Sequence, residues 1–588
     1  MDCSMAYDKY PLVQVSDSSA GCWSGWQAIT DEIKTRLHRL PAASTQRVVI
    51  ECYQGIPEME VGDAFYRALP PPAVIMHPFE AMKSAEEINA FFHEDITDDE
   101  VFGFMTRHQI DRFFDEEKVE GMRQLINLLR GTIVICGTGA SYICPEADIL
   151  IYADLSRWEI QQRFRRNELS NLGVENRQER PSLQYKRAFF VDWRVCDRLK
   201  KQTMKSWDYV LDAHRPAHPR MLTGERLWEG LRKTASRPFR LQPFFDPGPW
   251  GGQWMKEVCD LDRSAANYAW CFDCVPEENS LLLGFGDFRI EIPAINLVFA
   301  CPRELLGVPV YGRFGDEFPI RFDFLDTMGG GNLSLQVHPL TEYIREAFGM
   351  PYTQDESYYL LDAGADAVVY LGLKDGVCPE QMMAGLKEAQ ETGLFDAEAH
   401  VGVYPAKKHD HFLIPAGTVH CSGKNSMVLE ISATPFIFTF KLWDWGRLGL
   451  DGKPRPINLA HGEKVIQWNR TESWVRKELI NRVTLIREEE GLREEKTGLH
   501  EQEFIETRRH WFSRPVLHQT KGSVEVLNLV EGREVIVESP SGAFEPFVVH
   551  YAETFIVPAC VGPYSIRPYG ASEGQCCATL KAYVRHEA

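Results

Sequence analysis

The pattern of apolar residues changes near residue 237, and this change most restricts the folds open to the chain. Before it, short apolar runs alternate with helical patterns; the runs are residues 48–53, 73–77, 132–137 and 149–154. Strands that alternate with helices predict crossover connections and a buried parallel sheet. After it, short strand-like runs alternate with Gly- and Pro-containing turns, which is typical of sandwiches and barrels such as jelly rolls.

With 588 residues, the chain is too long for a single core, and we expect three domains. Residues 1–235 are interpreted as an α/β domain, residues 236–480 as a β-rich domain with a helical insertion, and residues 481–588 as a second small barrel. Helices are expected at residues 116–129, 340–348 and 379–392, and strands at residues 281–284, 288–292 and 295–299. The charged stretch REEEGLREEK (487–496) is interpreted as a solvated linker between the barrels.

Composition excludes several classes of function. Lys plus Arg is 64 and Asp plus Glu is 84, which gives a formal charge of −20 and disfavours nucleic-acid binding by phosphate neutralisation. No apolar run reaches the roughly 18–20 residues that span a bilayer, and the first residues lack the apolar core of a signal peptide. Fifteen scattered cysteines fit reduced thiols in a cytoplasm. The lone pair Cys271 and Cys274 has no second CxxC to complete a zinc site.

Three segments of the β-rich region together predict a metal centre. In NLSLQVHP, Gln336 and His338 are two residues apart and point to one face of an extended strand. Glu356 follows at the edge of an apolar run, and His420 follows the turn in FLIPAGTVH. Two imidazoles, a carboxylate and an amide oxygen suit Zn²⁺ or another first-row divalent ion with positions left for water or substrate.

The same segments resemble the type I mannose-6-phosphate isomerases, which are metal-dependent cupins. Further matches extend over residues 237–465; they are the segments 247–252, 318–326, 371–373, 428–431, 444–445 and 452–455. The resemblance implies that Gln336, His338, Glu356 and His420 bind the metal. It also implies a small-molecule sugar-phosphate substrate, and it leaves the oligomeric state open.

By this resemblance the protein interconverts mannose 6-phosphate and fructose 6-phosphate through an enediol. A divalent ion would stabilise the charge that develops on oxygen, and a general base would move the proton. Glu430 is the candidate base, with a structural carboxylate as the alternative, and Lys441 stands where the family has an arginine near the reacting sugar. Arg447 and Arg455 are candidate substrate-binding cations.

Two positions depart from the family pattern. The family often has a lysine just before FLD, where this chain has Asp323. It often has a second lysine two residues before the metal-binding glutamate, where this chain has Gln354. These losses leave two alternatives open: a regulatory cupin that binds a sugar phosphate without turnover, or a related enzyme with altered specificity. An iron-dependent oxygenase is disfavoured because Gln336 replaces a third histidine.

The first region is vaguely similar to P-loop kinases. Residues that could clamp phosphate follow the run at 149–154; they are Arg157, Arg163, Arg165 and Arg166. However, the loop CYQGIPEMEV lacks the glycines and lysine of the GxxxxGK[ST] motif. We therefore expect a kinase-like fold without phosphoryl transfer, with a structural or regulatory role, and the sensing of a nucleotide or sugar phosphate is left open as an alternative.

Overall fold

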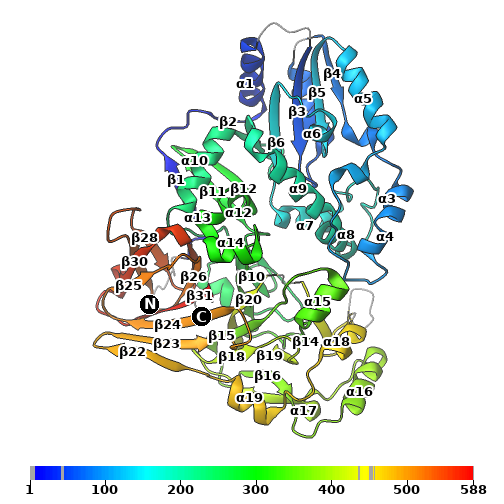
Figure 1. Cartoon of the computed structure of the whole chain (residues 1–588). Helices are drawn as coiled ribbons and strands as arrows, with labels where there is room; N and C mark the ends of the chain where they lie inside the picture. Colours follow the sequence, from blue (N-terminus) through cyan, green and yellow to red (C-terminus); the bar gives the residue numbers. More distant parts are fainter. Residues whose placement is uncertain are drawn as a thin grey trace.

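The computed structural model describes residues 7–40, 45–69, 71–434, 437–448, 455 and 457–586. These residues form a mixed α/β molecule with six sheets. In Figure 1 the largest sheet, in blue and cyan, stands at one end of the molecule, and the green to red segments make up the remainder. None of the described helices is both long and apolar enough to cross a membrane.

The largest sheet has seven strands and is parallel at its centre. Its strands, in spatial order, are β2 (Cys22–Ser24), β8 (Arg220–Thr223), β7 (Tyr209–Asp212), β6 (Ile149–Asp154), β3 (Thr45–Cys52), β5 (Gly131–Gly137) and β4 (Ala73–Met76). Strand β3 pairs in parallel with both β5 and β6. At one edge, β8 pairs antiparallel with β7 on one side and with β2 on the other. The four predicted strands and their parallel arrangement are therefore confirmed.

Helices cover this sheet because its central strands are apolar on both faces. The helices of this region are α1 (Trp26–Arg39), α2 (Glu58–Ala68), α3 (Ala85–Phe91), α4 (His93–Ile96), α5 (Glu116–Leu128), α6 (Ala140–Ile143), α7 (Arg157–Arg165), α8 (Pro181–Arg187), α9 (Trp193–Thr203) and α10 (Gly224–Ala235). Helix α5 ends one residue before the predicted limit and buries Val119, Met122 and Ile126 on one side. Helices α7, α8 and α9 lie at the end of this part that faces the rest of the molecule (Figure 1).

Two antiparallel sheets of the middle region enclose the candidate site. The first contains β18 (His411–Ile414), β15 (Glu356–Ala363), β20 (Ser426–Ala433), β13 (Ile320–Asp326), β10 (Trp270–Cys274) and β9 (Phe244–Asp246). The second contains β17 (Val401–Pro405), β16 (Val368–Leu373), β19 (His420–Ser422), β14 (Leu335–Val337) and β21 (Phe440–Trp443). Connecting helices are α11 (Trp254–Val258), α15 (Thr341–Phe348), α16 (Pro379–Thr392), α17 (Ala397–His400), α18 (Leu459–Val465) and α19 (Glu472–Glu478). The two predicted insertion helices correspond to α15 and α16.

A three-stranded sheet joins the start of the chain to its middle. Strand β1 (Leu12–Ser16) pairs in parallel with β11 (Ser280–Phe285), which pairs with β12 (Phe288–Pro293). The predicted strand at 295–299 is wrong, because Ile295–Ala300 forms helix α12, followed by α13 (Pro302–Leu306) and α14 (Val308–Phe314). A short apolar run is equally compatible with a buried helix, and Pro293 ends the preceding strand.

The C-terminal region has two further sheets. One contains β22 (Thr484–Glu489), β23 (Leu492–Gly498), β24 (Ile505–Phe512), β31 (Cys577–Val584), β26 (Glu525–Glu531) and β29 (Thr554–Val557); the other contains β25 (Val516–Gln519), β30 (Pro563–Pro568), β27 (Glu534–Glu538) and β28 (Phe547–His550). The predicted linker at 487–496 is wrong, because it forms most of the hairpin β22–β23. Residues of opposite charge face one another across the two strands; Glu488, for example, lies opposite Arg493. A charged strand at the edge of a sheet resists pairing with other chains.

Candidate metal centre and central cavity

Strand positions bring the predicted metal ligands together from both middle sheets. Gln336 lies on β14, directly opposite His420 on β19, and His338 follows one residue after β14 ends. Glu356 begins β15 in the facing sheet. Side chains two residues apart on a strand share a face, so Gln336 and His338 point the same way, as the sequence predicts.

The ligand atoms of His338, Glu356 and His420 lie within 4.8 Å of one another, and all three residues are buried. The carboxylate of Glu356 lies 3.0 Å from Nε2 of His338 and 2.8 Å from Nε2 of His420. The side-chain amide nitrogen of Gln336 lies 3.2 Å from Nε2 of His420, and turning that amide over brings its oxygen to the same place. Three candidate ligands therefore surround one point, and the side-chain amide of Gln336 lies next to one of them.

Hydrogen bonds on the far side of each ring favour metal binding. Nδ1 of His338 donates to the carbonyl of Phe438 at 3.1 Å, and Nδ1 of His420 donates to the carbonyl of Thr418 at 2.8 Å. In a neutral ring this leaves the lone pair of Nε2 directed at the oxygens of Glu356, and His338 Nε2 and Glu356 Oε1 have no hydrogen-bond partner. Lone pairs that face one another in a buried space fit a shared cation.

The charge state of Glu356 suits the same purpose. Burial acts to raise the pKa of Glu356, but interactions with His338 and His420 outweigh it and hold the pKa well below its usual range. The side-chain amide of Gln354 also donates to this carboxylate at 3.2 Å. Glu356 is therefore ionised and ready to bind a divalent ion. Among the described residues, no other group of three such side chains comes together, and Cys271 and Cys274 are free buried thiols.

The metal centre opens at Gln336 into a cavity of about 660 Å³, which we call the central cavity. Its polar lining includes residues of the first middle sheet (Arg321, Asp323 and Glu430), of the second (Lys441) and of connecting segments (Ser334, Gln354, Thr439, Arg455 and Asn458). A volume in this range accommodates a small organic ligand. The lining is rich in charge, as a pocket for a phosphorylated sugar requires.

Lys441 lies beside the metal centre. It stands on β21 directly opposite Gln336 on β14, so both side chains are on the same face of the sheet. Burial, followed by the neighbouring Arg455, lowers the pKa of Lys441 to about 8.

Glu430 lies on β20 opposite Asp323 of β13 and is held by Arg321, whose Nη2 donates to its carboxylate. Burial raises the pKa of Glu430 well above its usual range, and the negative charges of Asp323 and Glu356 act in the same direction. The sequence reasoning missed Arg321. Its signal was the alternation in IRFDFLD, where two charged side chains on a buried strand share one face and must line a polar space.

The two candidate substrate-binding arginines differ in their surroundings. Arg455 lines the central cavity and donates to Asp444 at 2.8 Å. Arg447 also binds Asp444 and donates to the carbonyl of Asn332 at 2.7 Å, and it is not among the residues that line the cavity. Of the segment 452–455, all but Arg455 lies outside the described residues.

One wall of the central cavity comes from the N-terminal region, which the sequence did not indicate. Trp158, Gln161 and Arg165 lie on one face of α7 and line the cavity, together with Arg180 and Tyr185 of the following segment. Further contacts fix this wall: Trp158 stacks on Phe244 with ring centres 3.9 Å apart, Gln161 donates to Glu278 at 2.7 Å, and Arg165 makes two bonds to Asp246 at 2.7 and 2.8 Å.

Comparisons with known proteins found a family model and several sequence relatives. A family model described as a domain of unknown function (DUF8485) matches residues 25–236. The mannose-6-phosphate isomerase ManA of Bacillus subtilis is 30% identical over 238 residues, which are 40% of this chain and 69% of that protein. The chain belongs to the mannose-6-phosphate isomerase family. The resemblance seen in the sequence is thereby confirmed.

Other members of the family and a solved structure match less closely. The mannose-6-phosphate isomerase of Streptococcus mutans is 24% identical over 246 residues, which are 41% of this chain and 72% of that protein. The crystal structure of mannose 6-phosphate isomerase from Bacillus subtilis aligns with a TM-score of 0.49 at 18% identity, covering 59% of this chain and all of that one.

Proposed function

We propose that the protein is a metal-dependent isomerase that interconverts mannose 6-phosphate and fructose 6-phosphate. The observation that carries this proposal is the convergence of His338, Glu356 and His420, with facing lone pairs, at the edge of a charged cavity of about 660 Å³. The names of the sequence relatives support the substrate.

The metal would be Zn²⁺, held by Gln336, His338, Glu356 and His420. Two neutral imidazoles, one carboxylate and one amide oxygen are a mixed nitrogen and oxygen set that suits zinc and leaves positions for substrate. When bound, the ion would orient the sugar oxygens and stabilise negative charge that develops on them.

Glu430 would be the general base. It would take the proton from C2 of the aldose and return it to C1, while a proton passes from O2 to O1, so that the product is the ketose with no net gain or loss. Pairing with Arg321 favours the ionised form of Glu430, and because burial raises its pKa, this carboxylate is then a stronger base than an exposed glutamate.

Lys441 would act on the sugar oxygens next to the metal, because it faces Gln336 across β14 and β21. The phosphate would be bound by other cations of the cavity, such as Arg455 of the middle region and Arg180 of the N-terminal region. Arg321 supplies a cation near Asp323, where the family often has lysine, so the loss of that lysine does not leave the pocket without positive charge.

We also propose a division into three domains that follows the expected boundaries, 1–235, 236–480 and 481–588. The paired antiparallel sheets support two jelly-roll barrels for the second and third domains. The parallel sheet with covering helices supports a kinase-like first domain, and the loop after β3 lacks the phosphate-binding glycines and lysine.

A coupled assay with mannose 6-phosphate tests the enzyme directly. Turnover is expected in the purified protein, loss of turnover after chelation, and recovery on adding Zn²⁺ but not Mg²⁺, which prefers octahedral oxygen ligands. Exchange of the C2 proton in deuterated water separates catalysis from binding alone. Metal-dependent binding of the sugar phosphate without exchange would favour the regulatory alternative and reject the isomerase.

A further inference from the structure

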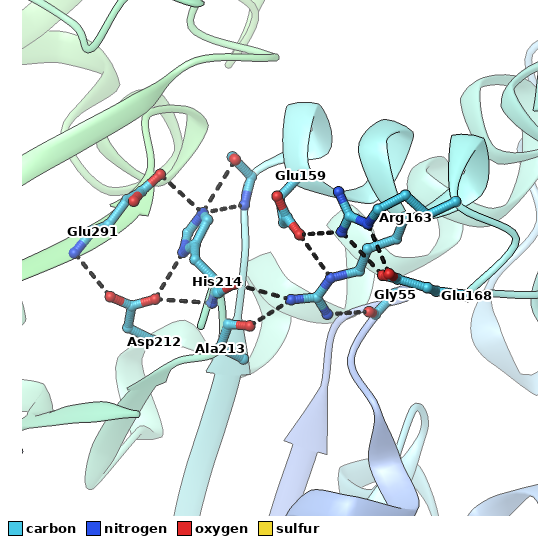
Figure 2. A network of polar contacts seen from close by, with 10 residues as sticks. Gly55, Glu159, Arg163, Glu168, Asp212, Ala213, His214 and Glu291 are labelled. Atoms are coloured by element: carbon cyan, nitrogen blue, oxygen red, sulfur yellow. Dashed lines mark hydrogen bonds and ion pairs between the residues drawn. The ribbon is translucent and has the colours of Figure 1, made fainter. Parts of the chain in front are cut away.

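Four arginines follow strand β6, and three of them are fully engaged by the protein itself. Arg163 donates to the carbonyls of Gly55 and Ala213 at 2.9 and 2.8 Å and pairs with Glu159, as Figure 2 shows. Arg166 pairs with Glu159 and Glu168, and Arg165 binds Asp246 through two hydrogen bonds. These three side chains are paired with other groups of the protein, and none of them lines the cavity that Arg157 lines.

Arg157 is different. It is 3% exposed, and only its Nη2 is bonded, to Asp197 at 2.5 Å. Its Nε and Nη1 are buried and have no hydrogen-bond partner. Leaving charged donors unsatisfied in a buried place costs free energy, so such atoms indicate a missing acceptor.

Arg157 lines a small cavity, and a second arginine that lines it, Arg194, also has a hydrogen-bond donor without an acceptor. Nη2 of Arg194 on α9 is also buried without a partner. The cavity has a volume of about 220 Å³ and is also lined by Arg107, Arg198 and Lys201. We call it the arginine cavity. None of the residues that line it lines the central cavity.

The place of the arginine cavity in the fold is typical of a ligand site. Helix α7 begins with Arg157, three residues after the carboxyl end of β6, and Tyr53 after β3 donates to Asp197 at 2.9 Å. In open α/β sheets, ligands bind in the crevice beyond the carboxyl ends of the strands. One face of α9 lines this crevice with three residues spaced three and four apart, Arg194, Asp197 and Lys201.

The acidic residues of the arginine cavity do not supply the missing acceptors. Asp197 already binds Arg157 Nη2 and Tyr53, and Asp316 pairs with Lys201 at 2.9 Å. Glu317 accepts from Tyr352 at 3.1 Å, and burial raises its pKa to about 7. Glu277 also lines the cavity and lies near both arginines, but its carboxylate makes no hydrogen bond to Nε or Nη1 of Arg157 or to Nη2 of Arg194. The free donors of Arg157 and Arg194 therefore remain for an outside anion.

We propose that the arginine cavity binds a phosphate group, carried either by inorganic phosphate or by a small phosphate ester. Guanidinium groups match phosphate oxygens in charge and in planar geometry, and every unpartnered atom of Arg157 and Arg194 is a donor. The volume is below the roughly 300–1,000 Å³ of pockets for drug-sized ligands, which selects a small anion. The site is separate from the proposed isomerase chemistry and does not depend on it.

Calorimetric titration of the full chain with inorganic phosphate tests this proposal. The matched variants are Arg194→Gln in the arginine cavity and Arg455→Gln in the central cavity, where Arg455 is a proposed phosphate ligand. We expect the wild type to bind phosphate, Arg194→Gln to bind it at least tenfold more weakly, and Arg455→Gln to retain the arginine-cavity binding. Because Arg157→Gln would leave Asp197 buried without its partner and endanger folding, Arg107→Gln serves as the second variant, with a smaller loss expected from its exposed side chain.

The titration has clear contrary outcomes. Absence of phosphate binding, or binding that Arg194→Gln leaves unchanged, would overturn the proposal. A parallel titration with glycerol 3-phosphate distinguishes the two sources. Tighter binding than inorganic phosphate identifies an ester whose hydroxyl groups reach the carboxylates of Glu277 or Glu317, and equal or weaker binding identifies the free ion.

Discussion

At the scale of single residues, the candidate metal centre is marked by buried acceptor atoms that have no hydrogen-bond donor. Nε2 of His338 and the carboxylate of Glu356 are buried acceptors 3.0 Å apart, and neither ring can turn its proton inward without losing a bond to a carbonyl. Apart from protonating a ring, only a cation satisfies this arrangement. The ligands are thus fixed in orientation by the backbone before any ion arrives.

Replacing His420 by alanine should remove the metal and the activity but not the fold. We expect bound zinc to fall below stoichiometry and kcat/KM to fall by roughly a hundredfold or more, since even supporting partners of a ligand carry 10–100-fold effects. Elemental analysis and the coupled assay measure the two quantities. The exposed histidine in His93→Ala provides the control. Full metal content in His420→Ala would exclude this residue as a ligand.

Replacing Lys441 by glutamine should impair turnover of the sugar phosphate while metal content stays normal, because Lys441 faces the cavity and is not itself a ligand. We expect kcat/KM to fall about tenfold or more, as for the loss of a charge-assisted contact. Lys441→Arg should recover part of the loss. Lys424→Gln, on the exposed pair with Asp366, should behave as the wild type. Equal kinetics in both glutamine variants would remove Lys441 from the site.

At the scale of elements, helix α7 serves two cavities at once. Trp158, Gln161 and Arg165 line the central cavity, whereas Arg157, the first residue of the helix, lines the arginine cavity. Adjacent residues on a helix point about 100° apart, so a single turn can address both spaces. The position of this one helix therefore sets the shape of the central cavity.

The variant Trp158→Leu should enlarge the central cavity and loosen its wall. The stack of Trp158 on Phe244 would be lost, and KM for the sugar phosphate should rise roughly tenfold, which corresponds to about 1.4 kcal/mol of binding. Metal content should not change. Gln162→Ala on the same helix does not touch the cavity and is the matched control. An unchanged KM in Trp158→Leu would show that α7 does not contact the substrate.

The sequence predicted those elements and residues whose signals are local. Gln336 and His338 were found because strand periodicity places them on one face, and the parallel strands were found because they are continuous apolar runs. The strand expected at 295–299 failed because a short apolar run has no period of its own. The contribution of Trp158 was invisible because it arises when distant segments dock, and no local pattern of residues reports that contact.

At the scale of the whole molecule, a buried histidine joins the N-terminal sheet to the middle of the chain. Nδ1 of His214 lies 2.7 Å from Asp212 at the end of β7, and Nε2 lies 3.3 Å from Glu291 on β12 (Figure 2). Burial lowers the pKa of His214, but Glu291 and Asp212, with Asp154 behind them, outweigh it and raise the pKa to about 9. The two carboxylates thus favour an imidazolium that links the two parts at neutral pH, in competition with the backbone N–H of Ser156, which donates to Nε2 at 2.9 Å.

This link should make stability depend on pH. The pKa of His214 is about 9 in the folded protein and near 6.5 when unfolded, so its contribution is complete below about pH 6.5 and is lost as pH rises through 9. The contribution is on the order of 3 kcal/mol. The Tm difference between wild type and His214→Gln should be largest near pH 6 and should shrink by pH 9.5. The exposed His218→Gln is the control, and a pH-independent difference for His214→Gln would contradict the assignment.

The central cavity needs the side chains of α7, so its two contributing regions must stay on one chain in evolution and in protein engineering. A gene that encodes only residues 237–588 would specify a pocket open on one side, with Phe244 turned toward water in place of Trp158. The N-terminal region is therefore not a detachable accessory. Any recombination that separates it from the middle region would have to bring a replacement for the missing side.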